Sequence, residues 1–518
     1  MKIHVTTNHK YIDEIQTIAQ VFFPHARFCY GEAAEPTEWA IVSFIADETI
    51  TGEAYANGKL HGQYNLNVYN QPKYLTKKRM VMLAMYHALF NAVDIKTPWG
   101  ALTGVRPTKM VREWMDNGLS DAQVMRALQS TFCVQEDRAM LAVKVAHEEN
   151  RLAQRILSGH PTKNISGLFK PIGIYVSIPF CPSRCVYCSF NTAHKPWNYE
   201  MQARYIQAII TECQELPLKL HKIGGQVSSI YIGGGTPTAL TDDLLEQLLI
   251  AVTNVLSESA KEVKGEINCK SDSAPIEFTI EAGRPDTITS SNLRLMRHYG
   301  VNRISINPQT INDKTLEIIG RRHTAQDFLR AFEMTREEDF TCINTDVIAG
   351  LPGEGLSDMH NTMETLAILK PENITVHTLA IKRASKLNEH RVEQTLSCKT
   401  QKGHNYALPS TSTIEAQLKI AYESCAAQGL LPYYLYRQKN MAALFENTGY
   451  SLPGHECLYN IGMMSEIQTV LGVGAGAVSK YIIGNTLESD GSSHMQHVIT
   501  RDFNPKNPDI YIERRSKL

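Results

Sequence analysis

The sequence lacks several features that would place it in other classes of protein. It contains no apolar run long enough to span a bilayer, and its N-terminal MKIHVTTNHK turns polar almost at once, so no secretory signal is expected. It also lacks an excess of charge of either sign. The formal net charge of −1 argues against a whole-protein attraction to nucleic acid or to an anionic membrane.

A disulfide framework is also missing. The eleven cysteines are an odd number and, apart from one cluster, they are scattered along the 518 residues. This usage is typical of a large cytoplasmic protein with reduced thiols, so a cytoplasmic location is expected. A chain of this length is also expected to form more than one domain.

The chain is expected to divide into three parts. Residues 1–165 alternate strand-like and helical stretches, and helices dominate from Lys77, which predicts an N-terminal α/β accessory domain. The polar segment Ser158–Pro171 is expected to be a linker. Residues 170–385 form the second domain. Residues 386–518 are expected to be a mixed, mainly helical region that caps the substrate.

The second domain contains six short β-branched runs, and amphipathic helical stretches lie between most of them. This alternation predicts a parallel sheet with right-handed crossovers, either doubly wound or a partial barrel. Polar motifs follow the strands at their carboxyl ends, where they can converge on one mouth, so a partial (β/α)6 barrel is the preferred fold. The six runs begin at Ile172, Val227, Glu277, Arg303, Thr341 and Asn373.

The stretch IPFCPSRCVYCSF follows the first of these strands and carries Cys181, Cys185 and Cys188. A structural zinc site needs a fourth ligand, and the nearest histidine is His194, so zinc stays open but fits less well. A catalytic nucleophile needs only one cysteine. Three thiolates suit a [4Fe–4S] cluster with one iron that lacks a protein ligand. A chance cluster of buried cysteines is disfavoured, because Pro182 and the turn-like CPSR keep the thiols together.

These features resemble the radical S-adenosylmethionine (SAM) superfamily, in which an aromatic residue precedes the third cysteine. The flanking words narrow the resemblance to the oxygen-independent coproporphyrinogen III oxidase (dehydrogenase) family and its heme-chaperone relatives. The N-terminal extension and the overall length resemble most closely the long HemZ-type members. The words are, in chain order, YVSIPFCPSRCVYCSF, YIGGGTPT, FTIEAGRPDTIT, RISINPQTI with GRRH, and DVIAGLPGE.

The resemblance implies that Cys181, Cys185 and Cys188 hold a [4Fe–4S] cluster and that SAM binds at the open iron. Two SAM molecules are implied, and no side chain is assigned a catalytic role. Glycines let the backbone approach the cofactor, carboxylates suit amino and hydroxyl groups, and arginine suits a carboxylate. The implied SAM-binding positions are Tyr175, Tyr187, Ser189, Gly234, Gly235, Thr236, Glu281, Gln309, Arg321, Asp346, Thr378 and Val478.

The activity that the resemblance implies is the oxidative decarboxylation of coproporphyrinogen III to protoporphyrinogen IX in heme biosynthesis. The implied partners are this tetrapyrrole and a reduced flavodoxin or ferredoxin-type electron donor, with no nucleic acid and no membrane span. Four propionates on the substrate call for cations that can be buried against carboxylates. Lysine and arginine side chains are more often solvated on the surface. The candidate cations are Arg106, Lys109, Lys382, Arg383, Arg437 and Lys439.

Two alternatives are a heme-binding chaperone with a radical SAM domain and a radical SAM enzyme acting on another tetrapyrrole, such as a methyltransferase. The chain departs from the family words at Ser177, where histidine is usual. Phe190 stands where the oxidase often has a fourth cysteine, as in the chaperones. The chaperone word His-Asn-x-x-Tyr-Trp is not kept, since this region reads YNIGMM from Tyr459. The cofactor is thus better determined than the substrate.

Overall fold

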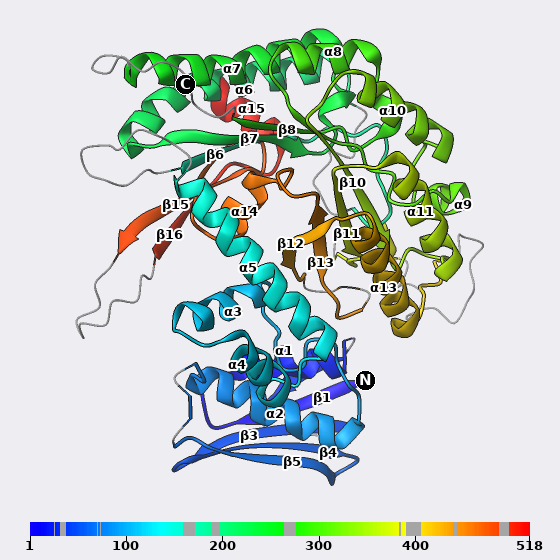
Figure 1. Cartoon of the computed structure of the whole chain (residues 1–518). Helices are drawn as coiled ribbons and strands as arrows, with labels where there is room; N and C mark the ends of the chain where they lie inside the picture. The colour runs from blue at the N-terminus through cyan, green and yellow to red at the C-terminus, as the bar shows by residue number, and fades with distance from the viewer. Residues whose placement is uncertain are drawn as a thin grey trace. The chain divides into compact units, whose positions relative to one another are not determined.

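The computed structural model divides the chain into two compact units. The first comprises Met1–His147 and Leu435–Glu446, and the second comprises Glu148–Tyr434 and Asn447–Leu518 (Figure 1). No helix in the described part of the chain is long and apolar enough to cross a membrane. The described residues are 1–24, 26–31, 38–69, 71–72, 74–158, 171–188, 197–263, 276–382, 385–389, 406–438, 441, 443–485 and 497–517.

The first unit is built on a five-stranded sheet in the order β2-β1-β3-β4-β5. Strand β1 pairs in parallel with β2 and β3, whereas β3, β4 and β5 pair antiparallel. Two glycines let helix α2 pack closely on β4 and β5. A Cβ at Gly52 would lie 2.6 Å from the Ala84 oxygen, and one at Gly62 would lie 2.0 Å from the Ala88 oxygen. The strands are β1 (Lys2–Thr7), β2 (Arg27–Tyr30), β3 (Trp39–Ala46), β4 (Thr49–Ala56) and β5 (Lys59–Asn67).

Helices complete the first unit, and a segment from far along the chain joins its core. Leu435 belongs to the apolar core of this unit, and the indole nitrogen of Trp99 donates to Glu446 Oε2 at 2.7 Å. The segment Leu435–Glu446 is therefore an integral part of the N-terminal unit. The helices are α1 (Ile12–Phe22), α2 (Lys77–Val93), α3 (Pro107–Asp116), α4 (Asp121–Arg126), the π-helical turn η1 (Ala127–Thr131) and α5 (Glu136–Ser158), which continues into the second unit.

The second unit is built on an eleven-stranded sheet in the order β12-β13-β11-β10-β9-β8-β7-β6-β14-β15-β16. Strands β6 to β11 pair in parallel in chain order, which confirms all six predicted strands. Their residues are mostly buried, as expected for strands covered on both faces. They are β6 (Pro171–Ile178), β7 (Gln226–Gly234), β8 (Glu277–Glu281), β9 (Arg303–Ser305), β10 (Cys342–Ala349) and β11 (Asn373–Thr378).

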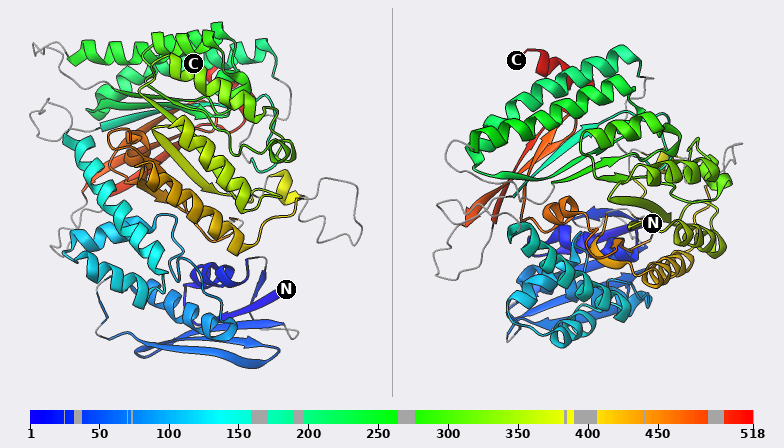
Figure 2. Two further views of the ribbon diagram at one scale, coloured as in Figure 1. Left: turned by 45° about the vertical axis from the view of Figure 1, so that its right-hand side comes forward. Right: turned by 45° about the horizontal axis from the view of Figure 1, so that its top comes forward.

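Helices follow these strands along the outer face of the curved sheet, as in a partial barrel (Figure 2). They are α6 (Tyr199–Ile223), the 3-10 turn η2 (Pro237–Ala239), α7 (Asp242–Val263), the 3-10 turn η3 (Pro285–Thr287), α8 (Ser290–His298), α9 (Asp313–Ile318), α10 (Ala325–Glu337), α11 (Leu356–Leu369) and α13 (Thr411–Ala427).

The C-terminal region is mixed, as predicted, but strands account for about as much of its described part as helices, so it is not mainly helical. Its strands extend the sheet at both edges. Strand β14 pairs in parallel with β6, whereas β13 pairs antiparallel with β11, so the sheet continues on both sides of the six-stranded core. These elements are β12 (Leu431–Tyr436), β13 (Asn447–Ser451), α14 (Leu458–Met464), β14 (Thr469–Val473), β15 (Val478–Asn485), β16 (His497–Phe503) and α15 (Pro508–Ser516).

Buried Glu212 on α6 joins the C-terminal helix to the glycine-rich turn after β14. Its carboxylate forms an ion pair with Arg515 and accepts hydrogen bonds from the Tyr511 hydroxyl at 2.6 Å and from the Gly474 nitrogen at 2.9 Å. The side-chain amide of Asn504 donates to the same carboxylate at 3.0 Å. Glu212 is therefore the common acceptor for donors that come from three separate segments.

We expect Glu212→Gln to lower the free energy of unfolding of the second unit by roughly 3 kcal/mol, because it removes the charge of the buried carboxylate that pairs with Arg515. The shift in the chemical denaturation midpoint measures this loss. Glu215→Gln is the matched control, since Glu215 binds the same Arg515 at 2.9 Å but is 36% exposed; its effect should stay within about 1 kcal/mol. Equal effects of the two variants would contradict the central role of Glu212.

Candidate functional site

The cysteine loop leaves the carboxyl end of β6 and is pinned by backbone hydrogen bonds to distant segments. The Val186 nitrogen donates to the Ile319 oxygen at 3.0 Å, and the Leu387 nitrogen donates to the Val186 oxygen at 3.0 Å. Within the loop, the Cys188 nitrogen donates to the Cys185 oxygen at 3.1 Å. The loop therefore has a defined path although it contains no regular secondary structure.

The glycine-rich turn after β7 packs directly on this loop. The Gly235 nitrogen donates to the Ile178 oxygen at 2.6 Å, and the Thr236 nitrogen donates to the Phe180 oxygen at 2.7 Å. A Cβ on Gly235 would lie 2.5 Å from the Phe180 oxygen, so only glycine permits this approach. Gly234 has a φ of +102°. The three glycines from Gly233 to Gly235 therefore allow the end of β7 to pack directly on the loop after β6.

Two of the three cysteine thiols lie beside specific polar groups. The sulfur of Cys181 is 3.3 Å from the Thr236 hydroxyl, and the sulfur of Cys185 is 3.8 Å from Nη1 of Arg284. Burial raises the pKa of the Cys181 thiol, while the positive charges of Arg284 and Arg321 act in the opposite direction. Nearby guanidinium groups thus favour the thiolate form that ligates metal.

Two acidic residues stand on β8 and β10 in different electrostatic settings. Glu281 accepts from the Tyr231 hydroxyl at 2.5 Å and from the Gly234 nitrogen at 3.3 Å, and burial raises its pKa. Burial acts in the same sense on Asp346, but hydrogen bonds from His377 and Asn344 outweigh it and lower the pKa of this carboxyl. Asn344 Nδ2 lies 2.9 Å from Asp346 Oδ1. One carboxylate is thus held ionised more strongly than the other.

Gln309 adopts a left-handed backbone conformation with a φ of +67°, which is uncommon for a residue other than glycine. It forms an isolated parallel bridge with Val347: its nitrogen donates to the Asp346 oxygen at 3.0 Å, and its oxygen accepts from the Ile348 nitrogen at 3.0 Å. The strained residue is therefore fixed against β10 beside Asp346.

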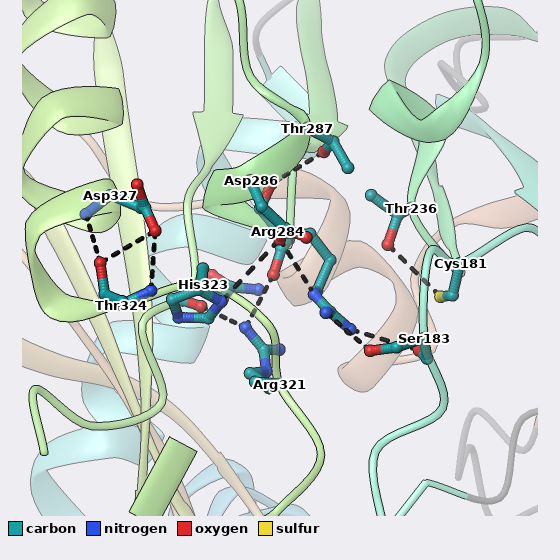
Figure 3. Close-up of polar contacts among 12 residues, drawn as sticks. Cys181, Ser183, Thr236, Arg284, Asp286, Thr287, Arg321, His323, Thr324 and Asp327 are labelled. Atoms are coloured by element: carbon teal, nitrogen blue, oxygen red, sulfur yellow. Dashed lines mark hydrogen bonds and ion pairs between the residues drawn. The ribbon is translucent and has the colours of Figure 1, made fainter. Parts of the chain in front are cut away.

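Two arginines and one histidine lie next to the cysteine loop (Figure 3), and of these Arg284 and His323 are buried. Arg321 donates through Nη1 to the Asn307 oxygen at 2.6 Å and to the Gly283 oxygen at 3.0 Å, while its Nε has no partner. Burial and the positive charges of Arg321 and Arg284 lower the pKa of His323 to about 3, so the imidazole is neutral. Arg284 and His323 were missed by the sequence analysis, although both lie in words that it quoted.

Three stacked tyrosines lie beside the acidic residues. Tyr175 on β6 and Tyr231 on β7 both stack on Tyr459 of α14, with centroid distances of 6.3 Å and 4.8 Å. Tyr231 and Tyr459 were not predicted as site residues, because the alternating pattern of β7 and the helical pattern of α14 are equally typical of core packing. The structure thus brings Tyr175 and Glu281 together through Tyr231.

The remaining predicted positions are less central in the described structure. Thr378 ends β11 and its nitrogen donates to Asn447 Oδ1 at 2.9 Å, while Val478 begins β15 opposite Phe503. Burial raises the pKa of the Tyr187 phenol. Ser189, like Phe190, lies outside the described residues. Roles in SAM binding for all these positions stay predictions.

The candidate cations differ in their surroundings. Arg437 is buried in the first unit, where its guanidinium donates to the Leu102 oxygen and lies 5.8 Å from the centre of the Trp99 ring. Arg106 and Lys109 line a cavity of about 650 Å³ in the same unit. Lys382 is in the second unit, and burial lowers its pKa. Arg383 and Lys439 lie outside the described residues.

The donor set fits a [4Fe–4S] cluster with one open iron. Three thiols come from one loop, two guanidinium groups lie beside it, and Arg321 Nε is a buried donor without a partner. Among the described residues, no three potential ligands lie close enough to hold a metal ion as they stand. In a [4Fe–4S] cluster each thiolate binds a different iron, so the three thiols need not converge on one metal ion.

Comparison with known proteins places this architecture among characterised families. Residues 175–366 match the model of the Radical SAM superfamily. The chain is 32% identical to the "Oxygen-independent coproporphyrinogen-III oxidase-like protein HemZ" of Bacillus subtilis, over 96% of this chain and 92% of that protein. It is 32% identical to the "Heme chaperone HemW" of the same organism, over 40% of this chain and 50% of that protein. Coproporphyrinogen III oxidase (HemN) from Escherichia coli aligns with a TM-score of 0.49 at 20% identity, covering 71% of this chain and 72% of that one.

Glu354, in the GLPGEG word after β10, is a buried carboxyl with an altered acidity. It is 4% exposed, and the Thr310 hydroxyl donates to its Oε1 at 2.5 Å. Burial raises the pKa of Glu354 from 4.5 to about 7. Because the folded pKa lies above the unfolded one, this group stabilises the fold fully below pH 4.5, and the contribution is lost as pH rises towards 7.

We expect Glu354→Gln to remove this pH dependence. Relative to wild type, the variant should gain about 3 kcal/mol of unfolding free energy between pH 4.5 and pH 8, since glutamine does not ionise. Denaturation midpoints measured across this range test the expectation. The exposed Glu364→Gln on α11 is the control and should follow the wild-type curve. A Glu354→Gln curve parallel to wild type would contradict the raised pKa.

Proposed function

Because the chain belongs to the radical SAM superfamily and, within it, to the family of the oxygen-independent coproporphyrinogen-III oxidase-like protein HemZ, we propose that it decarboxylates coproporphyrinogen III oxidatively. The observation that carries the proposal is the junction of the cysteine loop with the glycine turn. It joins the loop that carries the three cysteines to the turn at Gly234, whose nitrogen donates to Glu281, at the strand ends where barrels place their chemistry.

In this proposal Cys181, Cys185 and Cys188 hold the [4Fe–4S] cluster, and SAM occupies the neighbouring strand ends. When bound, the cluster and SAM supply a carbon-centred radical that removes a hydrogen atom from the substrate. The glycine turn packs closely on the cysteine loop, and in this proposal its backbone lies beside the cofactor. The number of SAM molecules is part of the proposal, and two are expected from the family words.

The polar residues at the strand ends have complementary roles. Asp346, held ionised by His377 and Asn344, accepts hydrogen bonds from amino or hydroxyl groups. Arg321 offers its free Nε to a carboxylate. Glu281 is held by Tyr231, and its raised pKa lets it exchange a proton nearer neutral pH than an exposed glutamate would.

The proposed reaction converts a propionate side chain into a vinyl group. A hydrogen atom passes from the β-carbon of the propionate to the cofactor-derived radical. The carboxylate then leaves as CO₂ and one electron passes to an external one-electron acceptor, which forms the double bond. Two turnovers give protoporphyrinogen IX. A reduced flavodoxin or ferredoxin-type protein supplies the electron that starts each turnover, and this partner is likewise proposed.

Heme binding and transfer is the second candidate function, because relatives named heme chaperone match up to 66% of the chain. The comparison of the chaperone word His-Asn-x-x-Tyr-Trp with YNIGMM is corrected by a start four residues earlier, at HECLYN. There His455 and Tyr459 match the His and Tyr of the word, and its Asn and Trp are replaced by Glu456 and Asn460. Tyr459 packs against Tyr175 and Tyr231, so the retained tyrosine has a structural use in this chain. A radical SAM enzyme acting on another tetrapyrrole is the third candidate.

Anaerobic turnover distinguishes these candidates. Reconstituted protein supplied with reductant, SAM and coproporphyrinogen III should form 5′-deoxyadenosine together with a vinyl-bearing product. Deoxyadenosine without decarboxylation would exclude this substrate and favour another tetrapyrrole. A full cluster without SAM cleavage, combined with stable heme binding, would favour the chaperone.

We expect Cys185→Ala to abolish assembly of the cluster, because two thiolates cannot hold it in place of three. Iron and sulfide content and the visible absorption of the reconstituted protein measure the loss. Cys425→Ala is the matched control, since Cys425 is buried in α13 and lies outside the cysteine loop. Unchanged iron content in Cys185→Ala would contradict the ligand assignment.

A further inference from the structure

Arg284 is a buried cation that contacts the cysteine loop, and the proposed function gives it no role. It follows β8 and is 2% exposed. Its Nη2 donates to the Ser183 hydroxyl at 2.8 Å and its Nη1 to the Ser183 backbone oxygen at 3.2 Å, as Figure 3 shows. The same Nη1 lies 3.8 Å from the sulfur of Cys185. One guanidinium thus binds the loop at three points.

The contacts of Ser183 extend this anchor. Its hydroxyl donates to the Gly320 oxygen at 2.8 Å, just before Arg321 in the chain. The loop segment Ser183–Cys185 is therefore held between the end of β8 and the turn after α9. Because a planar guanidinium has donors in a fixed fork, it can hold a backbone oxygen and a hydroxyl at once.

The charge of Arg284 is only partly balanced by protein groups. Among the described residues its carboxylate partner is Asp286, with 3.4 Å between Nε and Oδ1, and the Asp286 side chain is 23% exposed. The two Nη atoms are directed to the cysteine loop instead. In a buried site of low dielectric, a positive charge beside a thiolate stabilises added negative charge.

We propose that Arg284 is a positioning residue for the cluster: it fixes the loop around Cys185 and raises the cluster's reduction potential. Resting on the proposed radical SAM function, the inference concerns the step in which one electron passes from the reduced flavodoxin or ferredoxin-type donor to the cluster. The donor is oxidised and the cluster reduced in this step. Hydrogen bonds and positive charge near the cluster sulfurs favour its reduced form.

Redox titration of the reconstituted wild type, Arg284→Gln and Arg284→Lys tests this role. The fraction of reduced cluster is read by electron paramagnetic resonance at set potentials. In Arg284→Gln the ratio of reduced to oxidised cluster at the wild-type midpoint should fall about tenfold, which is about 59 mV for one electron. Arg284→Lys keeps the charge and should stay within about threefold of wild type. A purely structural role would not separate these two variants.

Arg297→Gln is the control, because Arg297 is another arginine of this unit that donates to the backbone oxygens of Glu338 and Val301. Its potential should match wild type. An unchanged potential in Arg284→Gln would overturn the proposal. If Arg284→Gln holds no iron, near-normal iron and potential in Arg284→Lys support it, and equal loss in both variants overturns it.

The titration does not depend on turnover. A wild-type protein whose cluster is reduced but whose substrate is not decarboxylated contradicts the proposed reaction and leaves the comparison of Arg284 variants intact. A wild-type protein that assembles no cluster contradicts both.

Discussion

The arrangement of the candidate site depends on the close contact between two strand ends. The loop after β6 and the turn after β7 share hydrogen bonds from Gly235 to Ile178 and from Thr236 to Phe180, and a side chain at Gly235 would prevent them. Parallel pairing in register brings these ends to one edge of the sheet, with Ile178 opposite Gly234. The cysteines, the glycine turn and Glu281 become neighbours through this one contact.

The two carboxylates of the site, Glu281 and Asp346, lie in different surroundings from its two arginines, Arg284 and Arg321. Hydrogen bonds from His377 and Asn344 lower the pKa of Asp346, whereas burial raises the pKa of Glu281, which accepts a hydrogen bond from the Tyr231 hydroxyl. The guanidinium groups of Arg284 and Arg321 lie on the side of the thiols. Anionic thiolates and carboxylates can thus be buried in one unit, because each has a partner that offsets the cost of its desolvation.

Each of the two units is stabilised internally by segments that are distant in sequence. The segment Leu435–Glu446 completes the core of the N-terminal unit, and Glu212 ties α15 to the turn at Gly474 in the second unit. Arg437 illustrates the consequence. It was a candidate for substrate binding, but its guanidinium is committed to the Leu102 oxygen and the Trp99 ring inside the first unit.

The sequence by itself determined the six core strands, the cysteine loop and the glycine turn, because hydrophobic periodicity and short motifs depend on neighbouring residues. It also led to the superfamily, since the words around Cys181, Gly234 and Asp346 are specific when taken together. Only the tertiary structure revealed the contacts of Arg284 and Tyr459. Arg284 meets Ser183 across 101 positions of sequence, and Tyr459 joins Tyr231 from a separate helix. Contacts of this kind leave no periodic trace, because they are created by the strand order and the packing of the folded chain.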